Sequence, residues 1–126
     1  MEQHQVHITK FPRTGWKALT KIELCQVAPG SEPLHREGGM RVLRIETSKG
    51  TKGGIYTSAL VCLERDGMTT WAIGSDFHKR IAASPSRCTE RSVSDLHSES
   101  LKQADAIVAE ARAYYEAKDQ PQRRAA

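Results

Sequence analysis

Cationic side chains stand next to aromatic ones at several points of this sequence. The neighbours are Lys10-Phe11, Trp16-Lys17 and the run Phe77-His78-Lys79-Arg80. A single strand of nucleic acid binds where cations follow its phosphates and exposed aromatic faces stack on its bases, at about 1–3 kcal/mol per stacked base. These residue types therefore favour recognition of an anionic polymer rather than a reaction.

A glycine-rich segment, Lys49-Gly50-Thr51-Lys52-Gly53-Gly54, combines two lysines with a backbone that side chains leave accessible. Amides and ammonium groups in such a segment can hold a phosphate. The segment lacks the GxxxxGK[ST] spacing of a nucleotide-binding P-loop and the helix that follows one, which excludes that motif. We expect a basic hairpin loop that touches a nucleic-acid backbone, and a solvated turn is the alternative.

Other reactive residue types show no catalytic or metal-binding spacing. Cys25, Cys62 and Cys88 form no CxxC pair, and the five histidines form neither HxxxH nor HExxH. Asp76 and His78 would share one face of a strand and could act as an acid–base pair, but a polar strand end is the preferred interpretation. We therefore predict no catalytic residue, no metal ligand and no cofactor.

The composition is that of one globular domain. Of 126 residues, 38% are hydrophobic and 27% are charged. No apolar run reaches the roughly 18 residues that span a bilayer, and the N-terminus lacks the apolar stretch of a signal peptide, so we expect a cytoplasmic protein without a membrane segment. Residues 1–58 hold nine Lys/Arg and five Asp/Glu, whereas residues 59–126 hold ten of each, so the net charge of +4 belongs to the first part. That surplus permits an anionic partner.

A β-hairpin is predicted where two β-rich runs, Ile55–Glu64 and Met68–Gly74, are joined at Asp66-Gly67. A two-residue type I′ turn needs positive φ at both central positions, and Asp-Gly supplies it. Four further strands are expected, the second with a bulge and the last preferred over a short helix. They are Gln5–Thr9, Trp16–Val27, Met40–Thr47 and Phe77–Ala83.

One long amphipathic helix is predicted from Ser92 to Lys118. Ser92 and Asp95 resemble a capping box, and the apolar side chains that follow recur at three- and four-residue steps. Residues 1–118 should form a single α+β domain, a curled antiparallel sheet of about five or six strands followed by this helix. Residues 119–126 are expected to be a disordered polar tail.

The favoured function is binding of single-stranded DNA or RNA by a small homodimer, through a basic sheet face. A sheet followed by one long helix is the general arrangement of several small dimeric single-strand-binding proteins. The predicted contacts are phosphate-binding Lys17, Arg41, Arg44, Lys49, Lys52 and Lys79, together with Trp16 and Phe77 as stacking rings.

The alternative is a non-catalytic protein-interaction or inhibitor module that dimerises through the C-terminal helix. Tyr114 and Tyr115 near the end of that helix would be its anchors. Nucleic-acid binding predicts basic and aromatic residues on one exposed sheet face. A protein-interaction module predicts a large exposed apolar patch on the helix or at a sheet edge instead. The sequence leaves open whether Tyr56 and Trp71 are core or exposed.

Overall fold

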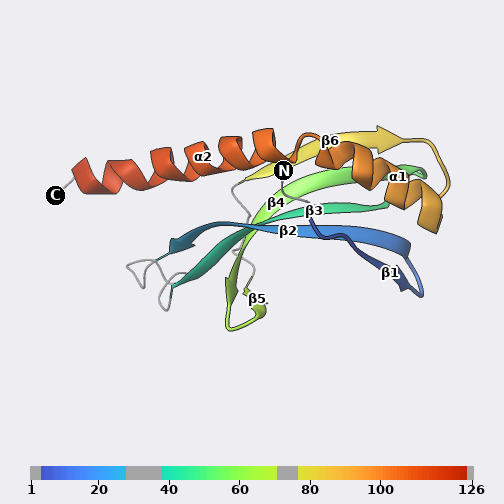
Figure 1. Ribbon diagram of the computed structural model, residues 1–126, viewed down its shortest axis with the longest axis horizontal. Coiled ribbons are helices and arrows are strands. Elements are labelled where there is room, and N and C mark those ends of the chain that lie inside the picture. The colour runs from blue at the N-terminus through green and yellow to red at the C-terminus, as the bar shows by residue number, and fades with distance from the viewer. Residues whose placement is uncertain (1–3, 28–37, 71–76, 125–126) are drawn as a thin grey trace.

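The protein forms a curved antiparallel sheet with both helices on one face (Figure 1). The computed structural model describes the backbone of residues 4–27, 38–70 and 77–124, and the side chains of all of these except 70 and 119–124. The elements are β1 (His7–Phe11), β2 (Gly15–Val27), β3 (Gly39–Lys49), β4 (Ile55–Arg65), β5 (Met68–Thr70), β6 (His78–Ser84), α1 (Glu90–Leu101) and α2 (Ala104–Arg124). The strands follow the order β1-β2-β3-β4, and β5 and β6 both pair with β4. The predicted α+β class with an antiparallel sheet of five or six strands is confirmed.

The Asp-Gly hairpin forms as predicted. Asp66 has a φ of 53° and Gly67 a φ of 78°, and the register places Arg65 opposite Met68. Positive φ at both positions is the geometry that joins two strands with the right-handed twist of a sheet. β5 ends at Thr70 as described, and the rest of the predicted strand, Trp71 included, lies outside the described residues.

Two further predictions about the strands are confirmed. The pairing of β2 with β3 shifts between Glu23 and Cys25, which is the expected bulge. The segment from His78 to Ser84 is a strand and not a helix, and it pairs with the first half of β4. A second shift at Thr57/Ser58 lets β6 follow the curvature of β4.

The single long helix is instead two helices. Lys102 donates its backbone N–H toward Glu99 and Ser100, and Gln103 donates to Ser100 at 3.0 Å, so the chain tightens for one turn at 102–103. A straight helix over 92–118 would be about 40 Å long and could not follow a curved sheet. The turn lets α1 and α2 pack on different parts of that sheet. α2 runs to Arg124, past the expected end at Lys118, and extends beyond the strands (Figure 1).

Two hydrophobic clusters lie between the helices and the sheet. The larger cluster packs Ile107, Ala111 and Tyr115 of α2 against Leu43 and Ile45 of the central strands and their neighbours. The smaller cluster gathers Ala18, Ile55 and Val93, with Trp16 and Cys88 packed against it. Within the described part of the chain, neither helix is both long and apolar enough to cross a membrane.

His97 of α1 is fully buried above the three central strands. Its Nε2 atom lies 2.8 Å from Thr20 Oγ1 on β2, and its Nδ1 atom lies 2.8 Å from Thr47 Oγ1 on β3. Thr47 Oγ1 is in turn 2.6 Å from Thr57 Oγ1 on β4. We call these four residues the histidine–threonine chain, because one imidazole ties the helix to three neighbouring strands.

The proton on each hydroxyl sets the direction of the histidine–threonine chain. Thr20 donates to the Gln5 carbonyl oxygen at 2.9 Å, so its own oxygen accepts from His97 Nε2–H. Nδ1 then carries no proton and accepts from Thr47, whose oxygen is left to accept from Thr57. This arrangement requires the neutral imidazole, and burial lowers the pKa of His97 from 6.5 to about 4.

We expect the stability of the fold to decrease as the pH falls from 6.5 to 4. Unfolded His97 takes up a proton near pH 6.5, while folded His97 resists protonation until about pH 4, so its contribution is present above 6.5 and lost between the two values. That contribution is about 3 kcal/mol at neutral pH. Urea denaturation at a series of pH values measures it.

A pair of histidine variants tests this assignment. His97→Gln should lower stability at neutral pH and remove this part of the pH dependence, whereas His7→Gln, at an exposed position of β1, should retain it. The same loss of stability below pH 6.5 in His97→Gln as in the natural protein would refute the role of His97.

Candidate functional site

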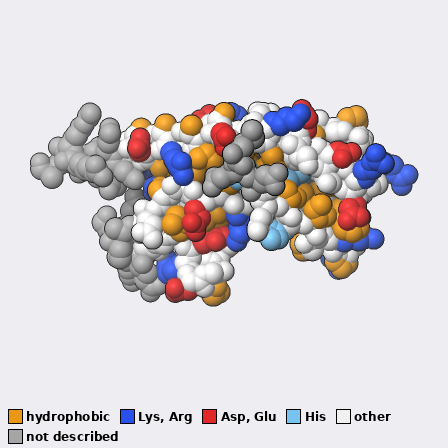
Figure 2. Space-filling view, viewed as in Figure 1, with side chains coloured by type: hydrophobic (Ala, Val, Ile, Leu, Met, Phe, Trp, Pro, Cys, Tyr) orange, Lys and Arg blue, Asp and Glu red, His pale blue; other side chains and the backbone are white. Residues whose placement is uncertain are grey.

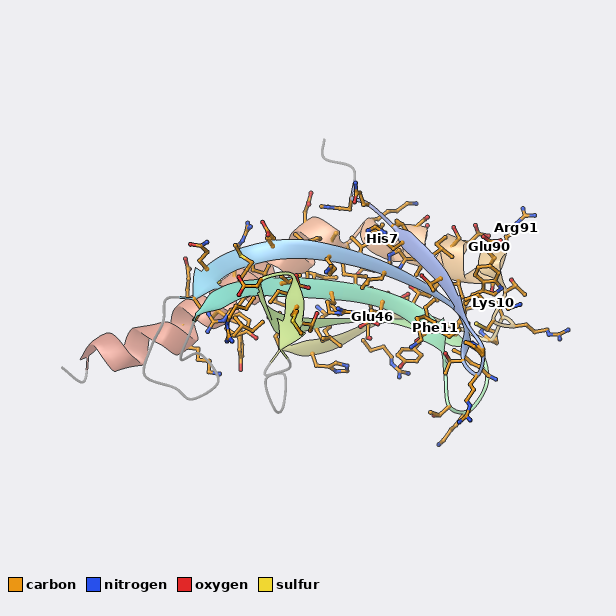
Figure 3. All side chains as sticks on the ribbon, turned by 90° about the horizontal axis from the view of Figure 1, so that it is seen from below. His7, Lys10, Phe11, Glu46, Glu90 and Arg91 are labelled. Atoms are coloured by element: carbon orange, nitrogen blue, oxygen red, sulfur yellow. The ribbon has the colours of Figure 1, made fainter. Side chains whose placement is uncertain are left out.

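The sheet face opposite the helices is turned toward the viewer in Figure 3, and we call it the open face because neither helix packs on it. Side chains alternate between the two faces along each strand, so Lys21, Arg44, Glu46 and Glu64 share this open face. Lys21 lies 2.9 Å from Glu64, and Arg44 lies 3.4 Å from Glu46. The middle of the face is therefore balanced in charge and gives little attraction to a polyanion.

Cations without an acidic partner gather instead at one end of the sheet, which we call the basic end. Its residues are Lys10, Arg13, Lys17, Lys49, Lys52, Arg80 and Arg87. In the part of the chain that the structure describes, none of these forms an ion pair. By contrast, Lys79 pairs with Glu110 at 2.8 Å and Lys102 with Glu99 at 3.0 Å. Figure 2 shows Lys and Arg side chains at the right-hand end of the molecule, with a few acidic ones among them.

The strand register brings the segments of the basic end together. Ala18 pairs with Thr47, so the turn before β2 lies beside the loop after β3. Ile55 pairs with Ser84, so the segment after β6 lies at the same end. Gly54 makes this approach possible: its φ is 71°, and a Cβ there would lie 2.6 Å from the Ser84 carbonyl oxygen. The β3–β4 loop therefore packs directly on the end of β6.

Two hollows lie at the basic end, on either side of the β3–β4 loop. The turn hollow has a volume of about 460 Å³ and is lined by Lys10, Phe11, Pro12, Arg13, Thr14, Gly15, Lys49, Gly53, Gly54, Arg87, Cys88 and Thr89. The loop hollow has a volume of about 500 Å³ and is lined by Gly50, Thr51, Lys52, Gly53, Ile55, Tyr56, Arg80, Ala83 and Ser84. No acidic side chain is among these described lining residues. Glu90 begins α1 at the same end (Figure 3) but lines neither hollow.

Three aromatic rings accompany these cations. Phe11 is 43% exposed, and Lys17 Nζ lies 5.1 Å from its ring centre. Tyr56 is half-buried beneath Arg80, whose guanidinium carbon lies 4.5 Å from the ring centre. Lys10 Nζ lies 5.7 Å from the ring centre of Trp16, and Trp16 also packs against the smaller hydrophobic cluster. Phe11 thus offers the most accessible face for stacking on a base.

The structure brings together half of the eight residues that the sequence suggested. Lys17, Lys49 and Lys52 belong to the basic end, and the ring of Trp16 lies next to Lys10 there. Arg44 lies on the open face in its ion pair with Glu46.

The other three of the eight lie elsewhere. Arg41 is 7% exposed and lies over the Tyr115 ring at 4.1 Å, and Phe77 is 7% exposed and packs edge-on against Tyr114. Lys79 lies on the helix side of the sheet, in its ion pair with Glu110. β3 pairs with β4 in one unbroken register, so Arg41 and Arg44, three residues apart, lie on opposite faces of the sheet.

Four cations join the site although the sequence hypothesis left them out: Lys10, Arg13, Arg80 and Arg87. Lys10 and Arg80 stand in the recurring cation–aromatic runs, and Arg13 follows Phe11 by two residues, which is the signal that identifies them. Arg87 belongs to a polar connection between β6 and α1, with no aromatic neighbour in sequence. Its position becomes visible only once β6 is paired with β4.

The remaining reactive groups form no second site. Within the described residues, no cluster of three or more His, Cys, Asp or Glu side chains is placed to hold a metal ion. Burial raises the pKa of the Cys62 thiol, an effect that Arg44 partly offsets. Cys88 borders the turn hollow and donates to the Trp16 carbonyl oxygen at 3.4 Å.

No family model matches the sequence, and no similar protein was found among curated proteins or solved structures. What the basic end does is therefore inferred from its own residues.

We expect Cys62 to be the slowest of the three thiols to react in the folded protein. It is 2% exposed and its pKa is raised, so reactive thiolate is scarce, whereas Cys25 and Cys88 are half-buried. Iodoacetamide labelling followed by peptide mass spectrometry measures the three rates. Labelling of Cys62 in the folded protein as fast as that of Cys88 would contradict the burial seen here.

Proposed function

We propose that this protein binds single-stranded nucleic acid through the basic end of its sheet. One observation carries the proposal: six cations that form no ion pair within the described residues line two hollows, together with the exposed ring of Phe11 and the half-buried ring of Tyr56. Phosphates attract cations without regard to base sequence, and the aromatic faces stack on any base. The combination therefore suits a strand whose bases are unpaired.

The placement of Phe11 supports this choice over double-stranded DNA. Phe11 is 43% exposed at the end of edge strand β1, near the turn to β2, and no strand or helix of the described residues covers its exposed face. A base in a duplex is stacked on both sides and cannot reach such a ring without being extruded. An unpaired base reaches it at no such cost.

The alternative, a protein-interaction module that dimerises through the helix, receives less support. The apolar stripe of α2, which includes Ile107 and Ala111, is buried against the sheet. Among described side chains, the exposed large hydrophobic residues are Val6 just before β1, Phe11 at the end of β1, Met68 in β5 and Tyr114 in α2. A stable interface needs a contiguous apolar centre, which these separate side chains do not form. A homodimer and a cytoplasmic location stay predictions.

Replacing Lys49 and Lys52 together by alanine should weaken binding of a labelled oligothymidylate about tenfold at low salt. Two phosphate contacts would be lost, so the slope of log K against log salt should become less steep by about 1.4. Fluorescence anisotropy at several salt concentrations measures both quantities.

A matched control is the double variant Lys79→Ala/Lys102→Ala. It removes the same charge from lysines that are already ion-paired on the helix side, and we expect its affinity to change less than twofold. Equal losses in the two double variants would show that net charge, and not the basic end, drives binding. Unchanged affinity of Lys49→Ala/Lys52→Ala would remove the β3–β4 loop from the interface.

Phe11→Leu should reduce the binding free energy by about 1–3 kcal/mol because it removes a stacking face. Phe11→Tyr keeps an aromatic face and should bind as the natural protein does. Since Phe11 is 43% exposed on an edge strand, both variants should unfold at nearly the natural temperature. Equal affinities of the Leu and Tyr variants would exclude stacking at this position.

A further inference from the structure

The geometry points to a more specific ligand for the turn hollow: we propose that it binds the terminal phosphate of the strand, a phosphomonoester. This inference rests on the proposed function and names the part of the ligand that this hollow selects. A strand end with a free phosphate would be held more tightly than the interior of the same strand.

Four cations converge on the turn hollow from three segments of the chain. Lys10 and Arg13 come from the end of β1 and the turn after it, Lys49 from the end of β3, and Arg87 from the connection between β6 and α1. A groove that follows a nucleic-acid backbone distributes its cations along a path, about one for each phosphate. Here they surround one hollow, which is the arrangement for a single group of high charge.

The charge of a phosphomonoester matches this arrangement better than that of a phosphodiester. A monoester carries about −1.5 to −2 at pH 7 and offers three acceptor oxygens. A diester within the strand carries a single negative charge and two non-bridging oxygens. Two guanidinium groups, those of Arg13 and Arg87, can each make paired hydrogen bonds to phosphate oxygens. Lys10 and Lys49 would bind the third oxygen and balance the second negative charge.

The walls of the hollow favour a small anion as well. Its described lining contains no acidic side chain, and Thr14 contributes a hydroxyl group, whereas the hydroxyl of Thr89 is bonded to Ser92. Thr89 is also the N-cap of α1, so the positive end of that helix lies at the same wall. These features, like the cations, favour an anion as the ligand.

The neighbouring loop hollow can hold the next part of the nucleic-acid strand. Gly53 lines both hollows and therefore forms the ridge between them, and nothing lies within 4 Å of where its Cβ would stand. A strand can pass over this ridge without meeting a side chain. On the far side, Tyr56 and Arg80 offer an aromatic ring and a cation to the next nucleotide.

The test compares four oligothymidylates of equal length, measured by competition against a common labelled strand. One carries a 5′-phosphate, one a 3′-phosphate and one no terminal phosphate, and the fourth carries a terminal phosphate esterified with an alkyl group. We expect one of the two monoesters to bind about tenfold more tightly than the unphosphorylated strand. The alkyl ester, with one charge fewer, should lose most of that gain. The 5′ and 3′ arms identify which end is held.

Matched variants separate the turn hollow from the rest of the basic end. Arg13→Ala/Arg87→Ala should abolish the preference for the phosphorylated end, while Lys52→Ala should weaken all four ligands by a similar factor and keep the preference. In the natural protein, the phosphorylated strand should also slow alkylation of Cys88, which borders the hollow, and leave Cys25 at the other end of β2 unchanged.

Equal affinity for all four oligothymidylates would overturn the terminal-phosphate site while leaving single-strand binding intact. Binding of none of them at low salt would overturn both proposals. A preference that survives in Arg13→Ala/Arg87→Ala would place the phosphate elsewhere and overturn the assignment to this hollow.

Discussion

His97 makes hydrogen bonds to hydroxyl groups on two neighbouring strands, and a third strand joins through Thr57. Loss of any member leaves a buried donor or acceptor unsatisfied, at a cost of about 1–3 kcal/mol. The same bonds hold the strand register, because side chains alternate between faces and a slip of one residue would carry Thr20 or Thr47 to the open face. A neutral imidazole therefore fixes both how α1 sits and how the sheet is aligned.

The basic end follows from that alignment. With β2, β3 and β4 in register, two loops and the connection to α1 meet at one end, and each brings cations that form no ion pair with a described acidic residue. Like charges held close together repel, and this destabilises the free protein to some degree. An anion bound there relieves the repulsion and stabilises the folded state by mass action. Anion binding therefore gives a physical reason for clustering these cations, whereas stability of the free protein does not.

Features set by neighbouring residues could be predicted from the sequence, and features set by long-range pairing could not. Asp66-Gly67 specifies its hairpin because both backbone conformations are local. The sequence of β2 likewise predicts its bulge, and that of β6 favours a strand over a short helix. The break between α1 and α2 contains neither Gly nor Pro and depends on the curvature of the sheet. His97 bonds to Thr47 and Thr20, which lie 50 and 77 positions earlier in the chain, and this pairing depends on the completed strand register. The inclusion of Arg87 in the site depends on the same register. Lysines in the β3–β4 loop were accessible to sequence reasoning because loops project from a sheet wherever its strands lie.

The hydrogen bond from Thr20 to the Gln5 carbonyl connects the beginning of the chain to a histidine near its end. During synthesis, residue 5 leaves the ribosome long before residue 97, and the chain grows by about 5–20 residues per second. The strands of the meander can pair meanwhile, but Thr20 and Thr47 then lack the imidazole that each contacts in the folded protein. The native core can close only after α1 has emerged, so the last steps of folding of this domain follow the synthesis of residue 97.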